Sequence, residues 1–410
     1  MSMSGMRNID ARNIGLRNIV VADTRICSIN GEEGELIYRG YDILDLVNHS
    51  TFEETSYLLL FGELPRNNEL AIFSKKLREA RQIPQRLIMS LKNRLPSAMP
   101  MDVLQSSVCE LADYDPNLDD DTKDANLNRA INLISKIPSI VAAWDRIRNH
   151  KEIVPATEEE SHASNFLHML RGKKPPAQEA KILDICLILH AEHSFNASTF
   201  AAREIASTRA HMYSCTGGAI GALSGELHGG ANVQVMKMLL DINEPKNVEK
   251  WVKNRLDAGG RIMGMGHAVY KTTDPRSEVL SRLSKIMSNQ KKTKWFEITE
   301  KIERITEKYM LEEKKQAIYP NVDLYSASLY HDMDIPMDLN TPIFAISRIA
   351  GWSAHIIEEK FAEAAPKPAL YRPKALYVGR YCGPMGCEYI PLEARVARDR
   401  FIENTNRTST

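Results

Sequence analysis

The stretch 343-IFAISRIAGWSAHII-357 is apolar on most faces of a helix, and one charged side chain, Arg348, interrupts it. An unpaired guanidinium in such surroundings would cost several kcal/mol, so Arg348 requires an anionic partner. A structural carboxylate would serve, and so would the carboxylate of a bound substrate. The stretch therefore predicts a buried helix that carries either an internal ion pair or part of an anion-binding site.

Helix signals recur along the rest of the chain. Residues 50–53, Ser-Thr-Phe-Glu, predict a capping box, and the apolar run that follows them ends at Gly62. Strand signals are almost confined to 26-ICSINGEEGELIYRG-40, whose extended halves flank Asn30-Gly31 as in a hairpin. We therefore predict a mainly α fold with a small N-terminal β-hairpin.

The composition is that of a large globular protein. The 410 residues exceed the usual size of one domain, so at least two lobes are expected. Lys plus Arg equals Asp plus Glu at 53 each, a balance that creates no general attraction to nucleic acid or to an anionic membrane. No apolar run approaches the roughly 20 residues that cross a bilayer, and the start lacks the apolar core of a signal peptide. We expect a cytoplasmic protein that binds neither nucleic acid nor membrane.

Cysteines and paired histidines give little support for a metal site. The six cysteines lie far apart, which favours reduced thiols over a disulfide framework. Cys382 and Cys387 have no second pair nearby that would complete a zinc site. His190 and His193 stand in HAEH rather than HExxH, without an evident third ligand. We expect no metal, and a substrate-binding or supporting role for these histidines.

His228 and Asp323 make chemical sense as a pair. His228 precedes a helix predicted to begin near Ala231, whose positive end favours a neutral imidazole that can donate a hydrogen bond to a carbonyl. Asp323 is a candidate general base, but a carboxylate is a weak base for a carbon acid unless a partner stabilises the enolate. Structural alternatives remain for both, since His228 could be satisfied in a loop and Asp323 could cap a helix.

Arg276 follows Asp274-Pro275, which predicts an N-cap and the first residue of a helix. A cation in the first turn opposes the helix dipole, so its position is better explained if an anion lies there. His267, nine positions earlier in a glycine-flanked loop, could reach the same anion. A routine surface ion pair explains Arg276 equally well on this evidence.

At these residues the chain resembles the citrate synthase family. The resemblance implies an almost wholly helical homodimer, with a large domain formed by 1–225 and 336–410 and a small domain, 226–335, that closes over the substrates. The similar segments run in family order from about Gly15 to Arg395: GLRNIVVADTRICSINGEEGELIYRGYDILDL, KIPSIVAAWDRIR, LILHAEHSFNASTFAAR, GALSGELHGGAN, GHAVYKTTDPR, PNVDLYSA, FAISRIAGW and YRPKALYVG.

The resemblance also implies an activity. An acyltransferase of this family condenses acetyl-CoA with oxaloacetate and water to give citrate and CoA, the reaction that feeds the tricarboxylic acid cycle, with no tightly bound cofactor. His193 and His267 would bind oxaloacetate, and His267 would polarise its ketone. Arg276 and Arg348 would hold its carboxylates, with Arg372 contributed by the other subunit.

For the acyl-CoA half of the reaction, the resemblance gives Asp323 the removal of a methyl proton. It gives His228 a hydrogen bond to the thioester oxygen. The positions matched to CoA contacts are Met263, Gly264, Met265, Gly266 and Lys271, with Lys314 and Lys315 as further phosphate candidates.

Three positions depart from common family patterns and leave the acyl preference open. Ala268 stands where many relatives carry Arg, Asn340 where others carry an aromatic residue, and Val233 where an acidic residue is common. The same motifs serve 2-methylcitrate synthase, which uses propionyl-CoA, and a pocket separates one methylene by only about 1–3 kcal/mol. Citryl-CoA lyase is a further alternative. A non-enzymatic CoA-binding homologue is disfavoured because all the expected catalytic groups are present.

Overall fold

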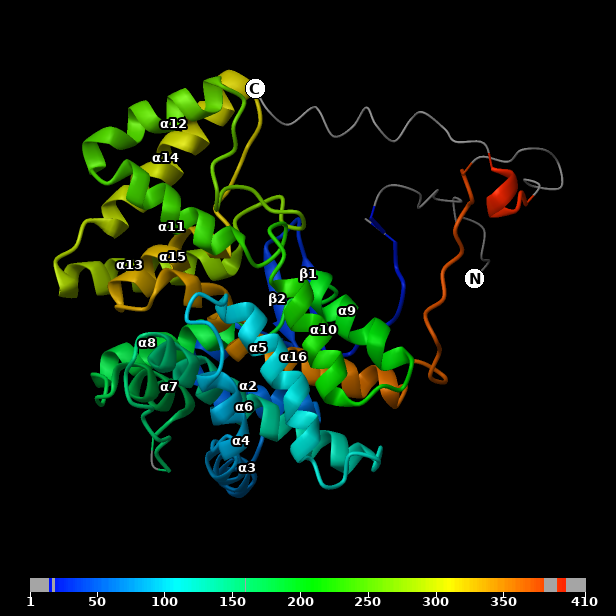
Figure 1. The fold of residues 1–410 in the computed structure, drawn as a ribbon. Coiled ribbons are helices and arrows are strands. Elements are labelled where there is room, and N and C mark those ends of the chain that lie inside the picture. Colours follow the sequence, from blue (N-terminus) through cyan, green and yellow to red (C-terminus); the bar gives the residue numbers. More distant parts are fainter. Residues whose placement is uncertain (1–14, 17–18, 159, 380–388, 396–410) are drawn as a thin grey trace. The chain divides into compact units, whose positions relative to one another are not determined.

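The chain folds mainly into α-helices, as predicted from its sequence (Figure 1). The structure, a computed structural model, describes residues 15–16, 19–158, 160–379 and 389–395. Over these residues the helices are α1 Ile43–His49, α2 Phe52–Phe61, α3 Asn67–Glu79, α4 Gln85–Lys92, α5 Pro100–Glu110, η1 Leu111–Tyr114, α6 Lys123–Arg148, α7 His162–Arg171, α8 Ala177–His190, α9 Ala197–Ser207, α10 Met212–Leu223, α11 Ala231–Ile242, η2 Pro245–Asn247, α12 Val248–Asp257, α13 Pro275–Lys291, α14 Trp295–Lys314, α15 Val322–Asp332, η3 Met337–Leu339, α16 Asn340–Lys360 and η4 Leu392–Ala394.

The chain divides into two units, Met1–Leu370 and Tyr371–Thr410. In the described part of the second unit, η4 is followed by Arg395, whose Nε donates a hydrogen bond to the Ile390 carbonyl at 2.8 Å. All the other helices belong to the first unit. No helix among the described residues combines the length and the apolar composition needed to span a bilayer.

The predicted hairpin is confirmed, with one strand more than expected. Strands β1 Cys27–Asn30 and β2 Glu35–Tyr38 pair antiparallel, with Cys27 opposite Tyr38. Strand β3, Tyr41–Asp42, then pairs with β2 after a turn in which Arg39 and Gly40 both have positive φ. A strand of two residues is too short to show alternating hydrophobicity, so the sequence pattern gave no sign of it.

The N-cap of helix α2 is Thr51, one residue later than the predicted cap Ser50. The side chain of Thr51, rather than Ser50, accepts a hydrogen bond from the backbone N–H of Glu54, and Gly62 ends the helix in the left-handed conformation. The Glu53 side chain, which the predicted capping box assigned to this turn, instead accepts from the backbone N–H of His162 at 2.7 Å. A long-range contact therefore replaced the local one.

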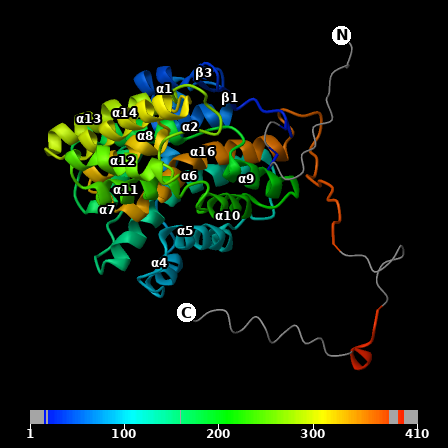
Figure 2. The same cartoon turned by 90° about the horizontal axis from the view of Figure 1, so that it is seen from above.

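Helix α16 lies at the centre of the first unit, as the view in Figure 2 shows. All 21 of its residues are buried, and it packs against α2, α6, α8, α9 and α10. Helices α11 to α15 pack mainly on one another and are grouped at the upper left in Figure 1. That group falls within the predicted small domain, whose boundaries at 226 and 335 remain a prediction.

Gly351 lets α16 approach the turn that follows α8. A Cβ on Gly351 would lie 2.1 Å from Oε2 of Glu192 and 2.4 Å from the backbone oxygen of Ala191. Both distances are far below van der Waals contact, and one of the opposing atoms belongs to the backbone. The close approach matters because the same turn carries His193.

Substituting Gly351→Ala should therefore lower the free energy of unfolding by about 1–3 kcal/mol, the usual cost of overpacking a core. Urea denaturation measures this change. The matched control is Gly225→Ala, at an exposed position where the nearest atom to an added Cβ is 3.4 Å away. Equal stability of the two variants would contradict the close packing described for α16.

Candidate active site

A cleft of about 680 Å³ gathers six of the predicted side chains in the first unit. Each comes from a different part of the chain: the turn after α8, the loop before α11, the loop before α13, and helices α13, α15 and α16. The six residues are His193, His228, His267, Arg276, Asp323 and Arg348. Three imidazoles, two guanidiniums and one carboxylate thus share one cavity.

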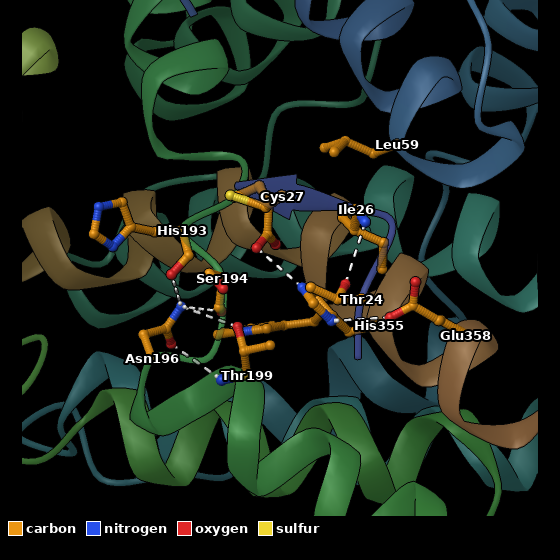
Figure 3. Close-up of polar contacts among 12 residues, drawn as sticks. Thr24, Ile26, Cys27, Leu59, His193, Ser194, Asn196, Thr199, His355 and Glu358 are labelled. Atoms are coloured by element: carbon orange, nitrogen blue, oxygen red, sulfur yellow. Dashed lines mark hydrogen bonds and ion pairs between the residues drawn. The ribbon is translucent and has the colours of Figure 1, made fainter. Parts of the chain in front are cut away.

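His193 is held by a tight turn, shown in Figure 3. The side-chain amide of Asn196 donates to the backbone oxygens of His193 and Ser194, and Ser194 has a φ of +49°. The Nε2 atom of His193 is buried and has no hydrogen-bond partner among the described residues. Burial, reinforced by Arg276, lowers the pKa of His193 well below its ordinary value, so the ring is neutral and available to a ligand.

The backbone fixes the tautomer of His267. Its Nδ1 accepts hydrogen bonds from the backbone N–H groups of Val269 and Tyr270, at 2.9 and 3.1 Å. Burial, followed by the charge of Arg276, lowers the pKa of His267 to about 4, so the ring is neutral near pH 7. A neutral ring whose Nδ1 accepts must carry its proton on Nε2, which makes Nε2–H a hydrogen-bond donor.

The opposite tautomer holds for His228. Its Nε2 accepts from the backbone N–H of Ser198 at 3.3 Å and lies 2.9 Å from the Ser198 hydroxyl. Burial and the charge of Arg348 lower the pKa of His228 to about 4. The proton therefore lies on Nδ1. Helix α11 begins at Ala231 as predicted, so the neutral form agrees with the position of His228 before a helix start.

Arg276 is buried, which excludes the alternative of a routine surface pair. It is only 2% exposed, and its Nε and Nη2 donate to the two carboxylate oxygens of Asp274 at 3.0 and 2.7 Å. Asp274 also caps α13 by accepting from the Arg276 backbone N–H. Burial alone would lower the pKa of Arg276, but the Asp274 carboxylate outweighs it and the net shift is upward.

Arg348 makes no ion pair with a carboxylate among the described residues. It is 4% exposed, and its Nε donates to the backbone oxygen of His190 at 2.6 Å. Burial lowers its pKa, while the nearby charge of Glu192 acts in the opposite direction. The Glu192 carboxylate is itself engaged by His355 at 3.0 Å. No direct ion pair therefore explains Arg348, and an anionic ligand in the cleft is the remaining candidate for a hydrogen-bonded partner.

Asp323 is not the cap of α15. The side chain of Asn321 performs that role by accepting from the backbone N–H of Asp323 at 2.9 Å, so the carboxylate of Asp323 is left for the cleft. Burial raises the pKa of Asp323 to about 6, and the charge of Arg276 opposes the rise. A carboxyl with a pKa near 6 is ionised at neutral pH and a better base than an ordinary aspartate.

The predicted CoA positions lie mostly outside the residues that line this cleft. Gly266 lines it, and Gly264 and Gly266 both have positive φ. Met263 and Met265 are partly buried against the core. Lys271 forms an exposed ion pair with Glu32. Lys314 ends α14 and Lys315 is its left-handed cap; neither lines the cleft, although both precede the lining residues Asn321 to Asp323 closely in sequence.

Other predicted residues fall elsewhere. Arg372 is exposed in the second unit, while Cys382 and Cys387 lie outside the described residues. The remaining four cysteines are free thiols. No group of three or more His, Cys, Asp or Glu side chains within the described ranges is arranged to hold a metal ion.

Three supporting side chains were not predicted from the sequence. Ser198 fixes the tautomer of His228, Asn196 holds the His193 turn, and Asn321 frees Asp323. Asn196 and Asn321 each stand directly before a helical segment, so their N-cap positions were a usable signal. The contact from Ser198 to His228 spans 30 residues and had no local signal.

The chain is similar throughout to proteins of one family. Residues 15–374 match the family that is described as citrate synthase, C-terminal domain. A citrate synthase from Haloferax volcanii is 40% identical, covering 93% of this chain and 98% of its own. A 2-methylcitrate synthase from Shewanella oneidensis is 37% identical, covering 89% and 94%. The solved ternary complex of Thermoplasma acidophilum citrate synthase with carboxymethyl coenzyme A and oxaloacetate superposes with a TM-score of 0.85 at 31% identity, covering 93% and 98%.

The fold thus has its counterpart in solved citrate synthases. The chain belongs to the citrate synthase family. It is accordingly an enzyme of the class that converts an acyl group into an alkyl group on transfer.

The two fixed tautomers can be measured directly. Nitrogen NMR of protein carrying labelled histidine, recorded near neutral pH, should give a neutral ring protonated on Nδ1 for His228 and on Nε2 for His267. The variants His228→Gln and His267→Gln assign the two signals by their disappearance. An imidazolium signal at either position, or the reversed tautomer, would contradict the hydrogen bonds described.

Proposed function

We propose that this protein condenses acetyl-CoA with oxaloacetate and water to give citrate and CoA. The observation that carries the proposal is the buried Arg348, which makes no ion pair with a carboxylate of the described residues and faces a cleft containing neutral histidines and an elevated-pKa carboxyl. Such a set binds a small dianion while keeping a base available. The bound oxaloacetate and CoA analogue named for the Thermoplasma acidophilum relative support the same substrates here.

Oxaloacetate would be held by charge and oriented by neutral donors. Arg276 and Arg348 bind its carboxylates, since guanidiniums match carboxylate geometry. His193 and the Nε2–H of His267 lie at the same cavity, and the latter polarises the ketone that is attacked. A neutral donor suits this step because it strengthens its hydrogen bond as negative charge develops on the oxygen.

The acyl-CoA half would use Asp323 and His228. The Asp323 carboxylate takes a proton from the methyl group of acetyl-CoA, while the Nδ1–H of His228 donates to the thioester oxygen and stabilises the enol. The enol carbon then attacks the ketone carbon of oxaloacetate, and the ketone oxygen becomes the citryl hydroxyl by taking up one proton, which balances the methyl proton that Asp323 removed. Water hydrolyses the resulting citryl-CoA thioester, which releases citrate and CoA.

Further parts of the proposal concern binding and assembly. The backbone at Met263–Gly266 would contact CoA, and Lys271, with Lys314 and Lys315 as further candidates, its phosphates; no cofactor is tightly bound. The segment 226–335 would close over the substrates as the small domain. The protein would act as a cytoplasmic homodimer, with Arg372 reaching the site of the partner subunit.

Propionyl-CoA is the alternative acyl donor, since 2-methylcitrate synthases from Shewanella oneidensis and Corynebacterium glutamicum are 37% and 39% identical to this chain. Thiol release from acetyl-CoA and from propionyl-CoA, each with and without oxaloacetate, tests the proposal. We expect oxaloacetate-dependent release that is faster with acetyl-CoA. Faster release with propionyl-CoA would indicate 2-methylcitrate synthase, and no oxaloacetate-dependent release with either would reject the synthase proposal. Cleavage of citryl-CoA without net synthesis would indicate the lyase.

Asp323→Asn should lower kcat by about 10²- to 10⁴-fold, the usual contribution of a general base, while calorimetry still detects oxaloacetate binding. The exposed Asp102 of α5 gives the control Asp102→Asn, expected to retain full activity. A near-normal rate for Asp323→Asn would exclude this residue as the base.

The pH profile should report the same carboxyl. Because Asp323 must be ionised to accept a proton and burial raises its pKa to about 6, kcat/KM should fall as the pH drops below about 6. The pKa values of His228 and His267, both about 4, leave these rings neutral over the same range. Rates measured from pH 5 to 8 check this expectation. A profile that is flat down to pH 5 would contradict it.

A further inference from the structure

A buried chain of side-chain amides connects three elements of the cleft. Asn340, the first residue of α16, is 1% exposed, and its Nδ2 donates to Oδ1 of Asn232 at 2.7 Å. Asn232, in the first turn of α11, is fully buried. Its own Nδ2 donates to the Ser326 hydroxyl at 2.6 Å and lies 3.5 Å from the backbone oxygen of Asp323. The chain runs from α16 through α11 to the first turns of α15.

The direction of this chain fixes what Asn232 presents to Asp323. Because Asn340 donates to Oδ1 of Asn232, the Nδ2 group of Asn232 must face α15. That donor group lies 3.5 Å from the backbone oxygen of Asp323 and acts to lower the pKa of the Asp323 carboxyl. If the Asn340 donor were removed, the side-chain amide of Asn232 could rotate by about 180° and bring its oxygen toward Asp323. That oxygen would oppose ionisation of the Asp323 carboxyl.

Local stability does not explain Asn340. Its Oδ1 is buried without a hydrogen-bond partner among the described residues, an arrangement that is normally unfavourable. The start of α16 is held to the loop before α11 without Asn340, because the Thr341 hydroxyl donates to the Gly229 backbone oxygen at 2.8 Å. A polar residue that leaves one of its own atoms unsatisfied indicates a role beyond packing.

We propose that Asn340 and Asn232 are positioning residues that orient the Asp323 carboxylate for proton abstraction. The inference rests on the proposed function, in which Asp323 is the base. Neither asparagine has to touch the substrate: Asn340 acts through Asn232, and Asn232 acts on the carboxylate. The ring of His228 stands four residues before Asn232, so the same contact also ties the segment that carries His228 to α15.

Other charged groups face Asp323 and set the background for its titration. Arg276 and Arg348 favour the ionised form, while Asp274 opposes it. His228 and His267 line the same cleft but are neutral above about pH 4. None of these groups contacts Asn340 by a hydrogen bond or ion pair within the described residues. A shift produced at Asn340 therefore has to pass through Asn232.

The test compares Asn340→Leu and Asn340→Ala, which both remove the donor while changing side-chain volume in different ways. With the stabilising effect of the Asn232 amide on the ionised carboxyl weakened, we expect the acid limb of kcat/KM to move up by about one pH unit. Activity at pH 6 would fall about fivefold, and the difference would nearly vanish by pH 8. The KM for oxaloacetate should stay unchanged.

Thr341→Val is the matched control, because it breaks a neighbouring contact of α16 without touching the amide chain. Its acid limb should stay at the position of the parent protein, and thermal unfolding of all three variants reports their folding. A loss of activity by the same factor at every pH, or an unshifted limb in both Asn340 variants, would overturn the inference. The proposed function fails separately, if Asp323→Asn turns over at a near-normal rate.

Discussion

A guanidinium buried in α16 without an ion-pair partner among the described carboxylates is the constraint on which the site depends. Arg348 stays charged in an apolar helix because the Glu192 carboxylate lies near it and the His190 backbone oxygen accepts its Nε–H. His190 ends α8 and Glu192 belongs to the turn that follows, which comes close to α16 at Gly351, where there is no side chain. The turn also carries His193. One close helix-to-turn contact therefore sets the positions of two groups of the cleft.

The two buried guanidiniums also decide the protonation of their neighbours. Their charge adds to burial in lowering the pKa values of His193, His228 and His267, so three imidazoles remain neutral beside a site suited to a dianion. A neutral imidazole has one nitrogen that donates and one that accepts. At His228 and His267 a backbone N–H group donates to one nitrogen, so the proton must lie on the other. Burial leaves Asp323 with a raised pKa even though both guanidiniums oppose the rise. Acid, base and anion-binding roles are thus separated by environment rather than by residue type.

Local patterns predicted much of this arrangement. The helix start at Pro275 followed from capping chemistry, and the start near Ala231 followed from apolar spacing. The mainly α class and the hairpin also followed from local sequence patterns. The predicted capping box was wrong because the Glu53 side chain accepts a hydrogen bond from the backbone N–H of His162, far along the chain, rather than from its own helix. The alternative of Asp323 as a helix cap was likewise excluded, because Asn321, two residues earlier, caps α15. A tertiary contact decided the first case and the position of the cap residue decided the second.

The sequence by itself determined the family, the helical class and the identity of the groups that could bind an anion or remove a proton, because these depend on residue type and spacing along one element. Only the tertiary structure decided that Arg348 makes no ion pair with the carboxylates described around it, which nitrogen of each histidine carries the proton, and which amides surround Asp323. Apart from the tautomer of His267, which the N–H groups of Val269 and Tyr270 set locally, these properties arise from contacts between distant residues, such as Ser198 with His228 and Arg348 with His190. Burial and direction of hydrogen bonds exist only once such segments are brought together.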